Sequence, residues 1–473
     1  MRTMNEKQYD NNNTDNEPSE KKRKSNDEHE HNQHQSIIVT SDVQLKMCQS
    51  SIFNLNIDCF EEVFDYLSLK QLAIVGETSK RMQQIVGHCF RQSYEAARAT
   101  FYYDFDVNYV HANFLIDFIR KIRVLQSNEA FYEFLRWNRL HSLVQIRFYD
   151  HILTKAKIEC MQVILGRVEA VELLECKIES DFFETFLMFC SNLRRLCVDG
   201  TTIIGTQYNW LLQHYPLLEH FQLLTAIGLE IEELATFFQL NPNIKRLSTG
   251  AKFFWFNQQT MTNTNLKLNT LAIKYDKRVY LMSFCRLLNK LYDSGFYKKL
   301  HLYFDHPLGF NQKIIEELKS VKALVKVAAN SRQNYINLSC LINLEELCIT
   351  CTHAVNDLEH LPNALTNLRR IYFLDASTDD ILPFIHRAPK LNKIKVRCLR
   401  GGIHFDEQSN VIDLKALNEE REKVGFATKI TFYVKEDVYL ATKWTMIKTE
   451  FNLIEMRRID SYDWNMEFQI DTL

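Results

Sequence analysis

The 473-residue sequence predicts an α/β fold: a short three-helix segment, then a solenoid of strand-plus-helix units with a curved parallel sheet inside and helices outside. Two observations support this prediction. Apolar residues recur at helical spacing between residues 55 and 86. Further along, an apolar pattern of the form x-L-x-x-L-x-L returns every 23 to 29 residues. A repeat of that length is typical of units that each contribute one strand and one helix.

Residues 1–50 are predicted to form a disordered polar tail. Asn, Asp, Glu, Lys, Gln and His dominate its first 36 residues, so it has little apolar surface to offset the entropy of ordering. The tail contains one short basic run, Lys21, Lys22, Arg23 and Lys24. This run is a candidate nuclear-import signal, and a solvated charge run explains it equally well. We therefore expect residence in the cytoplasm, the nucleus or both.

Residues 51–95 are predicted to form the three helices. Ile57, Phe60 and Phe64 fall at i, i+3 and i+7, which places them on one side of a helix. Leu72 and Val75 mark a second short helix, and a third follows with Ser79 as its expected N-cap. About forty residues cannot bury this many large apolar side chains among themselves. Some of them must face the rest of the chain or a partner.

The segment resembles an F-box, the module by which a substrate receptor binds the adaptor of an SCF-type (Skp–cullin–F-box) ubiquitin ligase. The matching residues are Leu55, Asp58, Glu61, Glu62, Phe64, Tyr66, Leu67, Ser68, Leu69, Leu72, Val75, Lys80 and Arg81. Two positions depart from the family pattern and bear on the strength of adaptor binding. Asn56 replaces a proline, and Met82 lies near the place of a tryptophan. Asparagine can still cap the turn, and methionine remains an apolar filler.

The resemblance implies that the adaptor and the cullin scaffold are partners of this chain. It implies adaptor-facing or F-box core roles, which the sequence alone does not divide, for Leu55, Ile57, Phe60, Val63, Phe64, Leu67, Leu72 and Val75. The chain would then be the substrate-recognition subunit of the ligase, leading to ubiquitination and degradation of its target. In the alternative, the helices only cap the repeats, and the chain is a non-catalytic scaffold or nuclear interaction protein without a ubiquitin link.

Residues 96–473 are predicted to form the solenoid, with irregular units at its C-terminal end. The second apolar anchor of each unit lies at Ile122, Ile146, Val171, Leu196, Phe221, Leu247, Leu271, Leu300, Leu324, Leu347, Ile371 and Ile394. Further strands are expected at Thr428–Val434 and Ile454–Ile459. A single unit cannot bury its apolar side, so stacking must build one continuous core. This part resembles the leucine-rich-repeat half of F-box proteins.

Residues that flank the second anchor should point away from the core, because side chains alternate along a strand. Many of these residues are basic or aromatic, and arginine and tyrosine are effective in protein interfaces. We therefore predict that this inner face binds an as yet unknown target through an acidic or phosphorylated segment. The predicted target-binding residues are Arg370, Tyr372, Lys393, Lys395 and Arg397. The alternative is a solvated surface with incidental charge.

The sequence gives no reason to expect an enzyme. It lacks the common nucleotide-binding, hydrolase and metalloprotease motifs, and we predict neither a cofactor nor a catalytic residue. The only CxxC, Cys348 to Cys351, lacks the further ligands that a zinc site needs, so no metal site is predicted. A net charge of −2 argues against nucleic acid or a membrane surface as the main partner.

Overall fold

The computed structural model describes residues 55–93, 98–100, 124–127, 143–205, 208–224, 231–276, 278–304, 312–329, 335–350, 356–400, 411–446 and 448–458. The predicted tail, with Lys21, Lys22, Arg23 and Lys24, lies outside these residues, as does Ile122. All the helices and strands below belong to the unit Ile57–Leu473.

Three helices open this unit: α2 (Ile57–Phe64), α3 (Leu69–Glu77) and α4 (Lys80–Ser93). Ser68 begins α3 with a capping box, in which its hydroxyl accepts from the Gln71 amide while the Gln71 side chain accepts from the Ser68 amide. The Ser79 hydroxyl accepts from the Met82 amide at 3.1 Å, in agreement with the predicted N-cap. Met82 is itself buried, so it serves as an apolar filler among these helices.

The main sheet is parallel throughout the described residues and follows the chain order of its strands. Its strands are β1 (Arg98–Thr100), β2 (Val124–Ser127), β3 (Gln145–Tyr149), β5 (Ala170–Leu174), β7 (Arg195–Asp199), β9 (His220–Leu224), β10 (Arg246–Gly250), β11 (Leu268–Tyr275), β12 (Tyr297–Phe304), β13 (Leu324–Ala329), β14 (Glu346–Ile349), β15 (Arg370–Ser377), β16 (Lys393–Arg400), β17 (Ile430–Val434) and β18 (Ile454–Arg458). A small parallel sheet joins β4 (Ile152–Leu153), β6 (Lys177–Glu179) and β8 (Thr202–Ile204).

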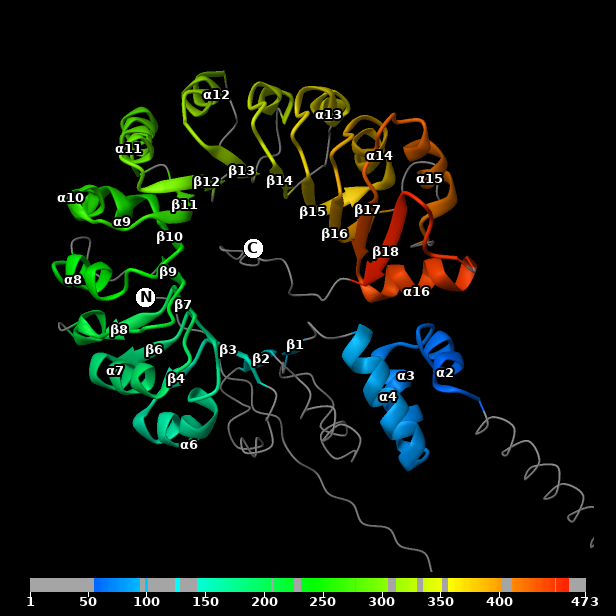
Figure 1. Ribbon diagram of the computed structural model, residues 1–473, viewed down its shortest axis with the longest axis horizontal. Coiled ribbons are helices and arrows are strands. Elements are labelled where there is room, and N and C mark those ends of the chain that lie inside the picture. The colour runs from blue at the N-terminus through cyan, green and yellow to red at the C-terminus, as the bar shows by residue number, and fades with distance from the viewer. Residues whose placement is uncertain are drawn as a thin grey trace, which may run out of the picture. The chain divides into compact units, whose positions relative to one another are not determined.

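The strands form the inner layer of the curved repeat region, and helices cover the outer side of the sheet (Figure 1). The outer elements are α6 (Lys155–Leu165), α7 (Ser180–Phe189), η4 (Asn209–Leu212), α8 (Glu233–Leu240), α9 (Ala251–Phe256), α10 (Gln258–Asn263), α11 (Leu281–Asp293), α12 (Gln312–Lys319), η5 (Tyr335–Cys340), η6 (Asn356–His360), α13 (Leu361–Ala364), α14 (Thr378–Arg387) and α15 (Leu414–Glu422). A further helix, α16 (Glu436–Thr445), lies beside β18 at the end of the sheet (Figure 1). The predicted fold class is therefore confirmed.

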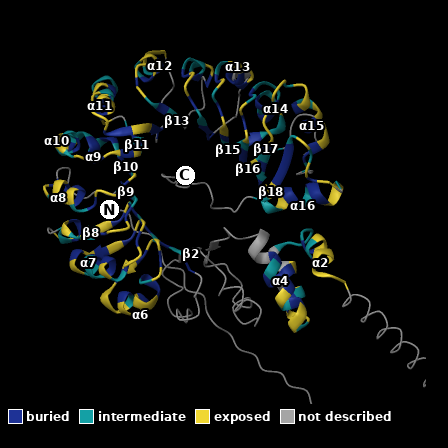
Figure 2. Ribbon diagram, viewed as in Figure 1, coloured by how far each residue is buried: buried dark blue, intermediate teal, exposed yellow. Residues whose placement is uncertain are grey.

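Most predicted anchors fall into register across neighbouring strands. Ile146 pairs with Val171, Val171 with Leu196, and the same alignment continues to Leu300. These anchors are fully buried, and they form one continuous core with the inward sides of the outer helices. Figure 2 shows this buried layer between the strands and the exposed faces of the helices.

The register departs from the prediction in two strands. In β2 the residue that pairs with Ile146 is Leu125, three residues after the predicted anchor Ile122. In β13 the predicted anchor Leu324 pairs with the anchor Leu300, but Val327 pairs with Leu347. The cause is a register shift in the pairing of β12 with β13, which lies between Leu300 and His301.

Candidate functional site

The structure divides the predicted F-box residues by their burial. Phe60, Phe64 and Leu72 are buried, and Leu67 and Val75 pack partly buried against the same core. Leu55, Ile57 and Val63 are exposed. A third exposed large apolar residue of these helices, Ile74, was absent from the predicted set although it is 56% exposed. Its signal in the sequence is an apolar residue that lies off the stripe defined by Leu72 and Val75.

Exposed large apolar side chains are therefore present on both α2 and α3. Ile57 and Val63 are 50% and 53% exposed, which is comparable with Ile74. Each would release water if a partner covered it, and covering apolar surface is the main favourable term in protein association. The buried residues of α2 and α3 support these side chains and are not available to a partner.

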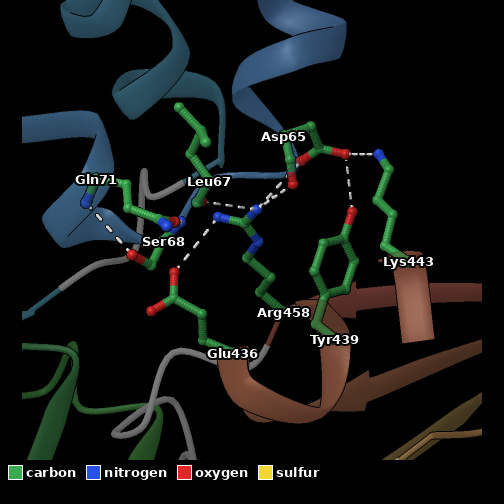
Figure 3. A network of polar contacts seen from close by, with 8 residues as sticks. All are labelled: Asp65, Leu67, Ser68, Gln71, Glu436, Tyr439, Lys443 and Arg458. Atoms are coloured by element: carbon green, nitrogen blue, oxygen red, sulfur yellow. Dashed lines mark hydrogen bonds and ion pairs between the residues drawn. The ribbon is translucent and has the colours of Figure 1, made fainter. Parts of the chain in front are cut away.

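The turn between α2 and α3 contacts the end of the repeat region (Figure 3). The carboxylate of Asp65 accepts hydrogen bonds from the Tyr439 hydroxyl, at 2.9 Å, and from the Lys443 ammonium. Arg458 donates to the backbone carbonyls of Asp65 and Leu67. It also pairs with the Asp65 carboxylate at 3.6 Å and with Glu436 at 3.5 Å. We call these groups the Asp65 clamp.

The cations of the clamp are well shielded from water. The side chains of Lys443 and Arg458 are 9% and 7% exposed, whereas that of Asp65 is 30% exposed. The Arg458 guanidinium also lies 4.7 Å from the centre of the Tyr439 ring. Burial raises the pKa of Tyr439, and the neighbouring Asp65 carboxylate adds to that rise, so its hydroxyl stays a donor. Sequence analysis missed this contact because its partners lie 374 to 393 residues apart.

A hollow of about 260 Å³ lies on the inner face of the sheet. Its lining comes from strands between β7 and β16, and it consists of Arg195, Leu196, His220, Phe221, Gln222, Arg246, Ser248, His301, Lys326, Glu346, Arg370, Tyr372, Lys393 and Lys395. Four of the five predicted target-binding residues are in this set. The fifth, Arg397, is partly buried on β16 and is not among the lining residues.

The lining residues of the hollow carry a positive charge. Six are lysine or arginine, and a single one, Glu346, is a carboxylate. Lys326 and Arg370 both pair with Glu346, at 3.3 Å and 3.1 Å. The Lys326 ammonium also lies 5.4 Å from the ring centres of Tyr303 and Tyr372. Lys393 and Lys395 lie 4.7 Å and 5.4 Å from the centre of the Tyr433 ring, so aromatic faces support three of the six cations.

The two histidines of the hollow add no charge at neutral pH. Burial, followed by the nearby Arg246 and Arg195, lowers the pKa of His220 to about 4. Burial and Lys326 hold the pKa of His301 well below its ordinary value. Burial also raises the pKa of the Tyr372 phenol to about 12. The charge of the hollow therefore comes from its lysines and arginines, and sequence analysis missed Lys326 among them because of the displaced register in β13.

Other kinds of site find no support in the described part of the chain. There, no group of three or more His, Cys, Asp or Glu side chains is placed to hold a metal ion. None of the helices that the structure describes has the length and apolar character needed to cross a membrane. Burial raises the pKa of the Cys176 and Cys285 thiols to about 12, which makes them poor nucleophiles at neutral pH.

In comparison with known protein families, the F-box domain matches residues 52–91 of this chain. Among solved structures, an internalin from Listeria monocytogenes matches with 14% identity and a TM-score of 0.28, covering 66% of this chain and 88% of that one. A leucine-rich-repeat protein from Leptospira interrogans also matches with 14% identity, at a TM-score of 0.23, covering 72% of this chain and 92% of that one. No curated protein matches this chain.

Proposed function

We propose that this chain is the substrate-recognition subunit of an SCF-type ubiquitin ligase. The observation that carries the proposal is the F-box match over residues 52–91, together with exposed apolar side chains on the matched helices. The chain performs no bond chemistry itself. It binds the adaptor, and through it the cullin scaffold, at one end and a target at the other, so that target lysines come close to a conjugating enzyme. Ubiquitination and degradation of the target follow.

In this proposal the adaptor contacts Ile57, Val63 and Ile74. The buried side chains of Phe60 and Phe64 instead pack in the core that supports these helices. The division follows from burial, because a side chain that is already covered has no apolar surface left to bury. Leu55, which is also exposed, remains in the predicted contact set. The test measures binding of purified Skp1-type adaptor to the chain.

We expect the single variants Ile57→Ser, Val63→Ser and Ile74→Ser each to weaken adaptor binding about five- to thirtyfold, because burial of each apolar side chain contributes about 1–2 kcal/mol. Ile342→Ser is the matched control, since Ile342 is 57% exposed but lies in the repeats. Wild-type chain that fails to bind the adaptor, or equal losses in Ile74→Ser and Ile342→Ser, would contradict the proposal.

The inner face of the sheet is the proposed target surface. Six cations against one carboxylate in the lining of the hollow favour an acidic or phosphorylated protein segment as its ligand. Tyr372 offers a rigid aromatic surface beside these cations. Arg397 remains a predicted contact outside the lining of the hollow.

Charge reversal tests the target surface. The variant Lys393→Glu/Lys395→Glu should lose its targets in affinity purification under proteasome inhibition, while adaptor binding is retained. Lys415→Glu is the control, because Lys415 is exposed on α15. An identical set of bound proteins in all three chains would refute this part of the proposal.

A second candidate function is supported by the Asp65 clamp. Contacts between the α2–α3 turn and α16 or β18 are also what a terminal cap of a repeat array would make. In that case the chain is a scaffold or nuclear interaction protein, and the adaptor does not bind.

We also propose that Lys21, Lys22, Arg23 and Lys24 form a nuclear-import signal. A nuclear fraction of the protein that is unchanged after their replacement by Ala would refute this proposal.

A further inference from the structure

The Asp65 clamp holds the F-box turn by both its side chain and its backbone. Tyr439 and Lys443, both on α16, converge on the Asp65 carboxylate. Arg458, at the end of β18, donates to the carbonyls of Asp65 and Leu67. The positions of backbone carbonyls depend on the conformation of the turn. Arg458 therefore stabilises the backbone conformation of residues 65–67 as well as their contact with the repeat region.

Hydrogen-bonded secondary structure lies on both sides of the clamp. On the F-box side, the capping box of Ser68 and Gln71 starts α3 directly after the clamped turn. On the repeat side, β18 pairs with β17, and β17 pairs with β16, which carries Lys393 and Lys395 of the hollow. A short series of hydrogen-bonded elements therefore links the F-box helices to the proposed target surface.

We infer that Asp65, Tyr439, Lys443 and Arg458 are positioning residues, which fix the direction in which the F-box presents the adaptor relative to the inner face of the sheet. This inference rests on the proposed function. The rate of transfer to a given lysine depends on how well that lysine is placed near the conjugating enzyme. A fixed orientation therefore selects which lysines are modified, and a loosened clamp broadens the selection.

Hydrogen exchange in the full chain tests the clamp itself. In Asp65→Ala and Lys443→Ala, amides of residues 65–71 should exchange about tenfold faster or more, because hydrogen bonds to charged groups are lost. The increase in the double variant should be smaller than the product of the two single increases, since both variants remove the Asp65–Lys443 interaction. Asp437→Ala is the control, because Asp437 is an exposed acid on the same helix. Wild-type exchange rates in all the variants would overturn the inference.

Ubiquitin transfer to the chain itself, in a reconstituted ligase, tests the consequence. Asp65→Ala should bind the adaptor as wild type does, yet modify a wider set of its own lysines, as mapped by mass spectrometry. Lys443→Ala should broaden the pattern in the same way, and Lys443→Arg, which keeps the positive charge, should give the wild-type pattern. A loss of stability alone would leave the pattern unchanged. An unchanged pattern, or weakened adaptor binding in Asp65→Ala, would refute the positioning role. If wild-type chain does not bind the adaptor, the proposed function fails, and the exchange experiment still decides whether the clamp exists.

Discussion

Replacement of Arg421 by methionine removes a fully buried guanidinium that joins α15 to the preceding unit. Its hydrogen bonds, between 2.8 and 3.4 Å, go to the backbone carbonyls of Ile385, Ala388, Pro389, Leu391 and Thr428. The first four carbonyls lie between the last turn of α14 and the start of β16. Carbonyls at the end of a helix have no partner within the helix, so Arg421 supplies the donors that this turn lacks.

The size of the effect follows from these contacts. A hydrogen bond to a charged donor contributes about 1.5–3 kcal/mol, and a buried carbonyl left without a donor costs about 1–3 kcal/mol. These losses are not additive, because all the carbonyls share one donor side chain. Methionine retains most of the apolar stem, so it leaves little cavity. We expect Arg421→Met to lower the free energy of unfolding by about 4 kcal/mol. Arg421→Lys keeps a charge but has three donors, and it should lose about 2 kcal/mol.

Urea denaturation measures the change, as a lower midpoint at an unchanged slope. Burial lowers the pKa of Arg421 to about 10, so the side chain is charged at neutral pH, where the assay is run. Arg387→Met is the control, because Arg387 is partly exposed and its side chain pairs with Glu359 at 2.8 Å. That variant should lose less than about 1 kcal/mol. A loss in Arg421→Met no larger than that of the control would refute the assignment of Arg421 as the donor for this turn.

The remaining predictions concern pH, capping and the F-box core. Because the folded pKa of His220, about 4, lies below its unfolded value, its contribution to stability is complete above about pH 6.5 and is lost as the pH falls towards 4. His220→Gln should therefore flatten the fall in urea midpoint between pH 7 and pH 4, and an unchanged fall would show that this histidine is not responsible. Ser68→Ala should cost about 1 kcal/mol by loss of the capping box, seen as faster amide exchange at the start of α3. Phe64→Ala should cost about 3–5 kcal/mol in urea denaturation, against less than about 0.5 kcal/mol for the exposed Val63→Ala. Equal losses in these two variants would contradict the burial of Phe64.

Most of the repeat region was predictable because its anchors have no alternative to burial. A strand residue such as Leu196 or Leu247 must face the core of a stacked unit, so its spacing appears directly in the sequence. The register of β13 was not predictable in this way. Leu324, Val325 and Val327 all suit a buried position, and the choice of Val327 depends on pairing with β12 and β14. Local apolar pattern cannot determine such a choice when several neighbouring residues satisfy it.

The F-box was recognisable from the sequence, but the roles of its residues were not. Ile57 and Phe60 are both large and apolar, and only the packing of α2 against α4 shows that Phe60 is covered and Ile57 is not. The Asp65 clamp was out of reach for another reason. Its partners are brought together by the whole length of the repeat region, and neither Asp65 nor Arg458 has a local pattern that signals the other.

The charge of the hollow illustrates the same limit, because a net charge of −2 for the chain conceals a local excess of cations. Curvature of the sheet brings Arg195 on β7 and Lys395 on β16 into the lining of one hollow. At Lys326 the neighbouring Tyr303 and Glu346 outweigh the effect of burial and raise the pKa of the ammonium, whereas burial of Lys395 costs free energy. An anionic segment would reduce that cost by pairing with the cations. A neutral or basic segment would remove water from the cations without a compensating ion pair, so its binding would be less favourable. The same residues would therefore exclude wrong targets as well as bind the right one.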